Sequence, residues 1–232
     1  MKYDQVVEGK FIKRLNRFIA EVELNGQVVK VHVRNTGRCM ELFIKGARVF
    51  LEPAKNPDRK TKYSLVALYK GDLLINIDSQ IPNYVAREAV FNNPYFKEIL
   101  GEVSYLKNEV TYGKSRFDLY YENEHRETKG FIEIKGVTLE LNGRVKFPDA
   151  PTKRGTKHVL ELVESMKDGY QSYILFIIQL SPATYFEPNR ETDPEFAKAL
   201  EIAKEAGVGL LCFDSIIKPD SIILNKPVEL RL

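Results

Sequence analysis

The first third of the chain contains five short runs rich in β-branched residues, each bounded by a turn signal. Asn25-Gly26, Lys45-Gly46 and Lys70-Gly71-Asp72 are the clearest of these signals. Five strands at such close spacing predict a small barrel of the OB type, a fold that often binds nucleic acid. A strand meander without a binding role is the alternative. The runs are FIAEVEL, QVVKVHV, ARVFLEP, YSLVALY and LLINI, at residues 18–24, 27–33, 47–53, 63–69 and 73–77.

The pattern changes near residue 82, where a helix-like stretch, IPNYVAREAVFN, follows the last strand run. Alternating and buried runs then predict three strands, a Gly-, Pro- and Lys/Arg-rich loop, a helix, a buried strand, a second helix and a last strand. Asp193 as N-cap, Pro194 at the first helical position and Gly207 after the end mark the second of these helices. The predicted bounds are 102–113, 115–122, 130–140, 142–157, 158–170, 172–180, 193–207 and 208–213.

This order of elements indicates an α/β (α+β) domain with a mixed central sheet. We therefore expect two domains, an OB-like barrel at 1–82 and the mixed-sheet domain at 83–232. The basic residues are unevenly divided between them. Residues 1–82 hold 15 Lys/Arg against 9 Asp/Glu, and residues 83–232 hold 20 against 23. A local excess of six positive charges fits a barrel that faces a polyanion. Ordinary scatter of charge is the alternative.

Composition excludes several classes of protein. The chain is 44% apolar and 29% charged, which is typical of a globular protein. No apolar run reaches the ~18 residues that a membrane span requires, and the N-terminus has no secretory pattern. We therefore expect a cytoplasmic protein with no membrane partner. Cys39 and Cys212 are far apart and lack metal-ligand spacing, so two free thiols are expected.

The stretch GFIEIKGVT, residues 130–138, places two charges inside an apolar run. On a strand, Glu133 and Lys135 share one face with Phe131. Asp118 lies fifteen residues earlier, on the strand that a hairpin would place alongside, and is expected to share a face with Arg116. Two neighbouring carboxylates repel unless a cation lies between them, and oxygen ligands suit Mg²⁺ or Mn²⁺. Lys135 would then hold the attacking water or stabilise the charge on phosphorus. A plain ion pair is the alternative.

Two basic segments are candidates for contacts with nucleic acid. Lys153, Arg154 and Lys157 precede His158 at a predicted helix start, where they could meet phosphates beside the metal site. An acid–base or substrate-orienting role for Lys157 or His158 is a second interpretation. A solvated helix start is a third. Four further basic residues lie on the loop KNPDRKTKY, which could grip a phosphate backbone or remain a solvated loop. They are Lys55, Arg59, Lys60 and Lys62.

Six blocks of the sequence resemble the sugar fermentation stimulation protein A (SfsA) family. In order they are HVRNTGRC, NPDRKTKYSL, IPNYVAREAV, SRFDLYY, EIKGVTL and FPDAPTKRGTKHVLEL. The blocks Asn35-Thr36-Gly37 and Phe147-Pro148-Asp149-Ala150 are the most specific. The resemblance covers nearly the whole chain and implies an OB-like N-terminal domain followed by a PD-(D/E)xK nuclease-like domain.

By this resemblance Asp118, Glu133 and Lys135 take the catalytic motif positions, and Asp118 and Glu133 hold the metal. Glu88, on the helix before the strands, takes the position of a further metal carboxylate, although an exposed helix glutamate is an equal alternative. Two residues depart from the family pattern. Gly136 follows the lysine, where it could loosen the strand, and Pro151 replaces a small aliphatic residue.

The resemblance implies a DNA-binding protein with a Mg²⁺- or Mn²⁺-dependent phosphodiesterase site, acting as an endonuclease or exonuclease. The alternative is a non-catalytic DNA-binding regulator of sugar (maltose) metabolism genes that keeps the nuclease-like fold. DNA, double- or single-stranded, is the expected partner, with a homodimer as one possible assembly. A sugar-binding or metabolic-enzyme role has no motif in the sequence.

Overall fold

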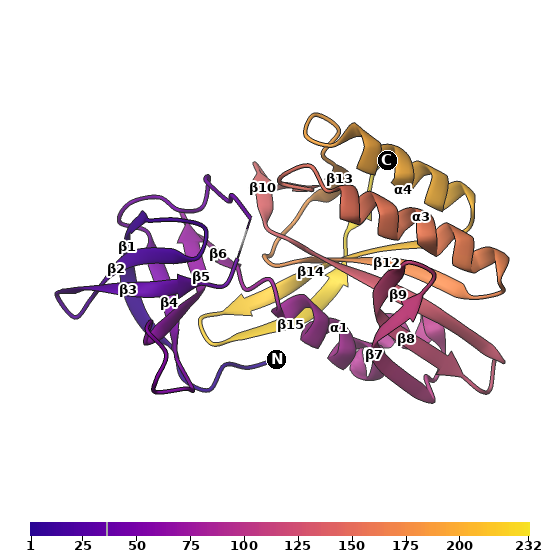
Figure 1. Cartoon of the computed structure of the whole chain (residues 1–232), viewed down its shortest axis with the longest axis horizontal. Coiled ribbons are helices and arrows are strands. Elements are labelled where there is room, and N and C mark those ends of the chain that lie inside the picture. Colours follow the sequence, from indigo (N-terminus) through magenta and orange to yellow (C-terminus); the bar gives the residue numbers. More distant parts are fainter. Residues whose placement is uncertain (36) are drawn as a thin grey trace.

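A computed structural model describes residues 1–35 and 37–232, so Thr36 of the Asn-Thr-Gly block lies outside the described residues. The N-terminal part is a β-barrel, on the left in Figure 1. Its strands follow the order β3-β2-β1-β4-β5, and a parallel pairing of β3 with β5 closes the ring. The predicted barrel and its five predicted strands are confirmed. The strands are β1 Val7–Arg14, β2 Ile19–Leu24, β3 Gln27–Val33, β4 Arg48–Pro53, β5 Tyr63–Lys70 and β6 Leu73–Asn76.

Strand β1 was not predicted. Gly9 reads as a break in the sequence, but the strand requires a glycine there because β2 passes very close. A Cβ on Gly9 would lie 2.7 Å from Val22 Cγ1 and 2.9 Å from the carbonyl oxygen of Glu23. The hairpin between β2 and β3 behaves as predicted. Asn25 and Gly26 both have positive φ, at 51° and 78°, as a two-residue type I′ turn requires.

The second part is a mixed-sheet α/β domain, as predicted. Its six-stranded sheet has the order β15-β14-β12-β9-β8-β7, parallel through β14, β12 and β9 and antiparallel towards both edges. Helices α3 and α4 pack on one face, and α1 and α2 on the other (Figure 1). The elements are α1 Ile81–Asn92, α2 Pro94–Leu100, β7 Tyr105–Tyr112, β8 Ser115–Asn123, β9 Thr128–Val137, α3 Lys153–Lys167, β12 Gln171–Ile178, α4 Pro194–Glu205, β14 Gly209–Lys218 and β15 Ser221–Pro227.

The loop predicted at 142–157 is wrong at both ends. A strand, β11 Arg144–Phe147, occupies its first part, and α3 already begins at Lys153. The strand belongs to a small second sheet, whose parallel pairings of β11 with β13 and of β13 with β16 join segments distant in sequence. The early helix start is fixed by Thr152, whose hydroxyl accepts a hydrogen bond from the Gly155 amide at 3.0 Å. The other strands of this sheet are β10 Leu139–Leu141, β13 Tyr185–Pro188 and β16 Glu229–Leu230.

The sequence signals for α4 are confirmed in detail. Asp193 caps the helix, since its Oδ1 accepts a hydrogen bond from the Phe196 amide at 2.9 Å. Pro194 occupies the first turn, and Gly207 follows the helix with φ of 91°. Helix α2 and strand β15 were not predicted.

Cys39 and Cys212 are both free, as expected, and both are buried. Within residues 1–35 and 37–232, no helix combines the length and the apolarity that crossing a membrane requires.

A buried ion-pair network fixes the junction between the two parts of the chain. Arg34, at the end of β3, pairs with Glu52 at 2.6 Å and with Asp78 at 2.9 Å. Asp78 lies between β6 and α1 and is fully buried. The Gln179 side chain, at the end of β12, donates hydrogen bonds to Asn76 Oδ1 at 2.9 Å and to the Asp78 carbonyl at 3.1 Å. The linker is therefore anchored to both sheets, although the division at residue 82 itself stays a prediction.

Gly136 does not loosen β9, contrary to the expectation above. It pairs in register with Ile177 of β12, within an unbroken parallel ladder from Gly130 to Val137. Its lack of a side chain makes room for the junction. A Cβ there would lie 2.5 Å from Gln179 Oε1 and 2.8 Å from Pro82 Cγ. Gly136 thus allows the start of α1 to pack against the strand that carries Glu133.

Replacement of Arg34 by alanine should strongly destabilise the protein. It leaves the buried carboxylates of Glu52 and Asp78 without their cation, which costs about 3 kcal/mol of unfolding free energy. The matched control is Arg48→Ala, which removes an arginine of the same barrel from an exposed pair with Glu8 and should change little. Urea unfolding of the two variants measures the difference. Equal losses would contradict the importance of the junction network.

Candidate functional site

Asp118 lies where β8 separates from β9. The pairing of the two strands runs from Asn123 and Thr128 to Leu119 and Ile132, and stops there. Beyond that point the Ile134 amide of β9 bonds to a side chain and not to the backbone of β8. Asp118 Oδ2 accepts this hydrogen bond at 2.8 Å. This bond holds the Asp118 carboxylate at the backbone of Ile134, which lies between Glu133 and Lys135 in the sequence.

The regular alternation of β8 is interrupted at Asp118. Phe117 packs in the cluster under α3, whereas Leu119 packs in the cluster under α1. On the other side, the pairing of β7 with β8 skips Glu109, which lies opposite Asp118 and has φ of 53°. The expectation that Asp118 shares a regular strand face with Arg116 is therefore wrong. The irregularity on both sides frees Asp118 to turn towards β9.

Glu133 is the buried centre of the site, with 2% of its surface exposed. It points to the α3 side of β9, as period two predicts. His158 Nδ1 lies 2.6 Å from its Oε1, and Lys135 Nζ lies 2.5 Å from the same atom. The other oxygen, Oε2, is buried and has no hydrogen-bond partner among the described residues. A buried, unpartnered carboxylate oxygen is costly unless something binds to it.

His158 acts on the site from α3 and does not lie at the surface. It is 5% exposed, and the edge of its ring meets Phe117. Arg154 Nε donates a hydrogen bond to His158 Nε2 at 3.4 Å, so Nε2 is the acceptor and Nδ1 carries the proton that it donates to Glu133. Both ring nitrogens are thus engaged within the chain, and His158 orients Glu133. Its contact with nucleic acid stays a prediction.

The two carboxylates have opposite electrostatic tendencies. Burial raises the pKa of Asp118 above its usual value, and the charge of Glu133 raises it further. Burial would also raise the pKa of Glu133. However, the hydrogen bond from His158 and the charge of Lys135 outweigh it, so the pKa of Glu133 lies below its usual value. Glu133 is thus held as an anion, while Asp118 resists ionisation beside it.

This donor set fits a hard divalent cation bound by two side chains. Both groups offer carboxylate oxygens, and Glu133 Oε2 lacks a partner. Among residues 1–35 and 37–232, no three His, Cys, Asp or Glu side chains are grouped as a metal site. The chain would therefore supply Asp118 and Glu133, and water or phosphate would supply the other oxygens, as Mg²⁺ commonly allows.

The structure does not bring Glu88 to this site. Its Oε2 accepts a hydrogen bond from the terminal amine of Met1 at 2.6 Å. It lines a separate cavity with Val85, Asn92 and Ile223. The two residues lie on different sides of α1. Asn83 lies on the side that faces Asp118, and Glu88 does not.

The predicted basic residues fall into two separate groups. Lys153 and Arg154 are exposed in the first turn of α3, near His158. Lys157 is also exposed, but its Nζ donates a hydrogen bond to the Lys114 carbonyl at 2.5 Å. The second group lies on the barrel loop between β4 and β5. There Lys55 pairs with Asp4, Arg59 and Lys62 bond to their own loop, and Lys60 is exposed.

Residues on α1 and β7 that the sequence analysis did not single out complete the surroundings of Asp118. Asn83 Nδ2 donates a hydrogen bond to Asp118 Oδ1 at 3.0 Å. One turn further along α1, Arg87 Nη1 donates to Asn108 Oδ1 of β7 at 2.8 Å. Asn83 and Arg87, together with Tyr84 and with Gln80 just before the helix, form the polar face of α1. The three- and four-residue spacing of these residues in the sequence could have revealed this face.

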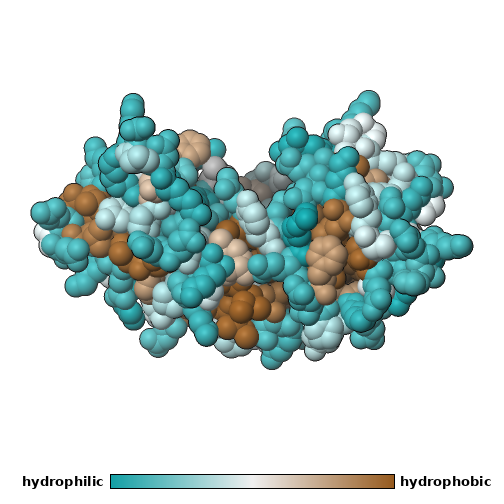
Figure 2. Space-filling model, turned by 90° about the horizontal axis from the view of Figure 1, so that it is seen from below, coloured by the Kyte–Doolittle hydropathy of each residue, from teal (hydrophilic) through white to brown (hydrophobic). Residues whose placement is uncertain are grey.

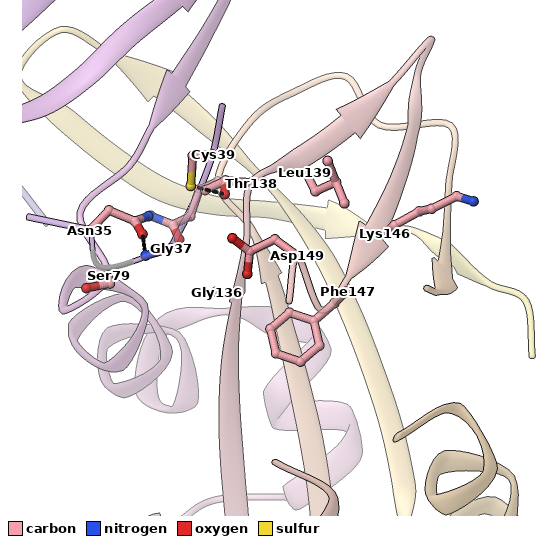
Figure 3. A pocket seen from close by; sticks show the side chains of 11 residues that line it. Asn35, Gly37, Cys39, Ser79, Gly136, Thr138, Leu139, Lys146, Phe147 and Asp149 are labelled. Carbon is pink, nitrogen blue, oxygen red and sulfur yellow. Dashed lines mark hydrogen bonds between the residues drawn. The ribbon is translucent and has the colours of Figure 1, made fainter. Parts of the chain in front are cut away.

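A second cavity, of about 260 Å³, lies between the barrel and the α/β domain. Figure 3 shows Asn35 and Cys39 reaching it from the barrel side, with the Asp149 carboxylate opposite. Asp149 Oδ2 accepts a hydrogen bond from the Arg38 amide at 3.1 Å. The described residues of the two most specific sequence blocks thus meet here, across the junction. In the view of Figure 2, the surface is hollowed between the two parts of the molecule.

Two family models match the chain. The model described as the SfsA N-terminal OB domain matches residues 12–77, and the model described as the sugar fermentation stimulation protein RE domain matches residues 80–221. A sugar fermentation stimulation protein homolog from Alkaliphilus oremlandii is 54% identical over 99% of this chain and 98% of its own length. A homolog of the same name from Clostridium beijerinckii is 49% identical over the full length of both chains.

A solved structure shows the same fold. SfsA of Pyrococcus furiosus, in complex with Ca²⁺, superimposes with a TM-score of 0.86 at 27% identity. The match covers 100% of this chain and 98% of that one. The barrel and the mixed-sheet domain are therefore shared along the whole chain.

Neutralising the two carboxylates should change stability in opposite directions. Glu133→Gln removes an anion that His158 and Lys135 stabilise, and should cost about 3 kcal/mol of unfolding free energy at neutral pH. Asp118→Asn relieves a carboxylate whose pKa is raised, so it should leave the Tm unchanged or higher. Thermal unfolding followed by circular dichroism measures both.

The pH dependence of this difference follows from the directions of the pKa shifts. Ionised Asp118 lowers the free energy of unfolding at pH values above its raised pKa. This loss of stability disappears as the pH falls below the pKa that Asp118 has in the unfolded chain. The contribution of Glu133 is present above the unfolded value and is lost as the pH falls through its lowered pKa. Wild type and Asp118→Asn should thus converge in Tm in acid. A Tm of Asp118→Asn below that of wild type at pH 7 contradicts the assignment.

Proposed function

The chain belongs to the sugar fermentation stimulation protein family, and on that premise we propose that it binds DNA and hydrolyses phosphodiester bonds with a divalent cation. The observation that carries the proposal is the buried, unpartnered Oε2 of Glu133 beside the carboxylate of Asp118. The match to an SfsA structure that contains Ca²⁺ supports a hard divalent cation, and Mg²⁺ or Mn²⁺ is the proposed ion here.

In this proposal Asp118 and Glu133 hold the cation. When bound, a divalent cation lowers the pKa of a coordinated water and polarises a phosphate oxygen. His158 keeps Glu133 ionised and fixes its orientation through the Nδ1 hydrogen bond. Lys135 has three N–H donors and uses one on Glu133, so it can direct another to the attacking water or to a phosphate oxygen that gains charge.

The DNA contacts in the proposal follow the exposed basic residues. Lys153, Arg154 and Lys157 at the start of α3 lie on the His158 side of the site. The barrel carries the positive excess of the chain, and its loop with Lys55, Arg59, Lys60 and Lys62 is the second contact. Arg59 and Lys62 also shape that loop through bonds to Thr61 and Pro57.

A second candidate function is a DNA-binding regulator of sugar metabolism genes that does not cut. One observation favours it. Lys135 and His158 both bind Oε1 of Glu133, so the anion is compensated even without a cation. A buried charge cluster of this kind can be kept for stability alone, because removing one partner is costly. Cleavage assays separate the two candidates.

Purified protein should cut plasmid or single-stranded DNA in the presence of Mg²⁺ or Mn²⁺. Because Glu133 would hold the cation and Lys135 would assist the attacking water, Glu133→Ala and Lys135→Ala should each lower the rate by about 100-fold or more. Gel electrophoresis of end-labelled DNA measures the rate.

Arg116→Ala is the matched control for that assay, since Arg116 lies on the same strand as Asp118 and is paired at the surface with Glu109. It should cut like wild type. Equal cutting by wild type, Glu133→Ala and Lys135→Ala would mean a contaminating nuclease. Salt-dependent DNA binding without any cutting would favour the regulator.

Lys60→Ala and Lys153→Ala should each weaken DNA binding to a similar degree for every sequence, because they remove phosphate contacts. Each substitution should reduce the slope of log Kd against log salt by about 0.9. Lys167→Ala is the control, as an exposed lysine at the other end of α3 that pairs with Glu164. Fluorescence anisotropy at several salt concentrations measures the slopes. Unchanged slopes in both test variants would remove these residues from the interface.

A further inference from the structure

A cavity of about 650 Å³ opens beside Asp118, between α1 and the β7–β8 hairpin. It is much larger than a cation and its waters need. Its residues include Gln80 just before α1, Asn83, Tyr84 and Arg87 of α1, and Asn108 of β7, with Asp118 at the edge. A space of this size has room for a nucleoside next to the proposed metal ligands.

Tyr84 is the aromatic residue of this cavity. It is 60% exposed, and its hydroxyl and ring make no hydrogen bond or aromatic contact with any other described residue. A large aromatic side chain left on the surface is available to stack, since every nucleobase has a flat π face. Neighbouring residues of α1 such as Val85 and Ala86 are buried, so the helix holds the ring in place.

Three carboxamides surround the ring with hydrogen-bonding groups of both kinds. Asn83 donates to Asp118 and keeps its carbonyl oxygen, while Asn108 accepts from Arg87 and keeps its NH₂ group. Gln80 adds a third carboxamide at the start of α1. The edges of bases carry donors and acceptors in alternation, and side-chain amides match them well.

The charges of the cavity do not suit a DNA backbone. Among the described residues that line it, Arg87 is the one cation, against the carboxylates of Asp118 and Glu109. A groove that follows the phosphates of a duplex is lined with several lysines or arginines. The basic residues proposed above as phosphate contacts lie elsewhere, at the start of α3 and on the barrel loop. The cavity therefore matches a base and not a phosphate chain.

Resting on the proposed function, we infer that this cavity receives one unpaired nucleobase next to the scissile phosphate, with Tyr84 as its stacking platform. Tyr84 is then a specificity-determining residue. The substrate class is single-stranded DNA, or duplex DNA that exposes an unpaired nucleotide. A fully paired blunt duplex keeps its bases stacked and must pay the cost of flipping one out.

A binding experiment without metal tests the inference independently of catalysis. The probe is a single-stranded DNA oligonucleotide containing 2-aminopurine, whose fluorescence falls when it stacks on an aromatic ring, in buffer with EDTA. Wild type should quench the probe. Tyr84→Ala should abolish the quenching and weaken binding by about 5- to 150-fold, the factor that corresponds to ~1–3 kcal/mol of base stacking. Tyr84→Phe keeps the ring and should behave like wild type.

Phe91→Ala is the matched control, because Phe91 is an exposed aromatic residue further along α1 that does not line the cavity. It should bind and quench like wild type. Equal binding and quenching by wild type and Tyr84→Ala would overturn the inference. So would a wild type that binds no single-stranded DNA.

Cleavage assays then separate this inference from the proposed function. With Mn²⁺, wild type should cut the single strand and a duplex with one unpaired nucleotide at least about tenfold faster than the blunt duplex. Tyr84→Ala should lose that preference. Equal cutting of all three substrates by both proteins would overturn the inference while the nuclease proposal stands. Tyr84-dependent quenching without cutting would uphold the inference and remove the catalytic proposal.

Discussion

The ionised carboxylate of Glu133, buried on a central strand, is the constraint on which the site depends. A charge in that position requires partners, and two parts of the chain supply them. Lys135 comes from the same strand and His158 from α3. The Ile134 amide holds a second carboxylate, that of Asp118, beside them at the separated end of β8. The unbroken hydrogen-bonded ladder between β9 and β12 fixes the position of β9, and therefore the position of the Glu133 carboxylate that Lys135 and His158 contact.

The junction between the barrel and the α/β domain serves the same strand. Gly136 follows Lys135 and lets Pro82 and Gln179 approach β9 closely. Gln179 in turn holds the linker at Asn76 and Asp78, and Asp78 pairs with Arg34 of the barrel. The start of α1 is therefore tied to the end of β9, which places Asn83 and Tyr84 beside Asp118. The barrel contributes to the site through this connection.

Features of one strand or helix were predictable from the sequence, and features of contacts between elements were not. Period two was enough to place Glu133 and Lys135 on one face, and the capping residues of α4 were local signals. The break at Asp118 depends on pairing with β7 and β9 at once. Glu88 was misplaced because one carboxylate on a helix gives no phase, whereas buried Val85 and Ala89 fix it in the structure. Strands β1 and β11 were missed although each has one partner close by in sequence, because Gly9 reads as a break in β1 and the four residues of β11 lie in a segment rich in Gly, Pro and Lys/Arg.

The central claim is that Asp118 and Glu133 bind one divalent cation in common. A crystal of the protein soaked in Mn²⁺, measured at a wavelength where manganese scatters anomalously, tests it most directly. We predict one anomalous peak within coordination distance of Asp118 and Glu133 Oε2, and its loss in a crystal of Glu133→Gln. Well-diffracting crystals at saturating Mn²⁺ with no peak between these two carboxylates would contradict the account.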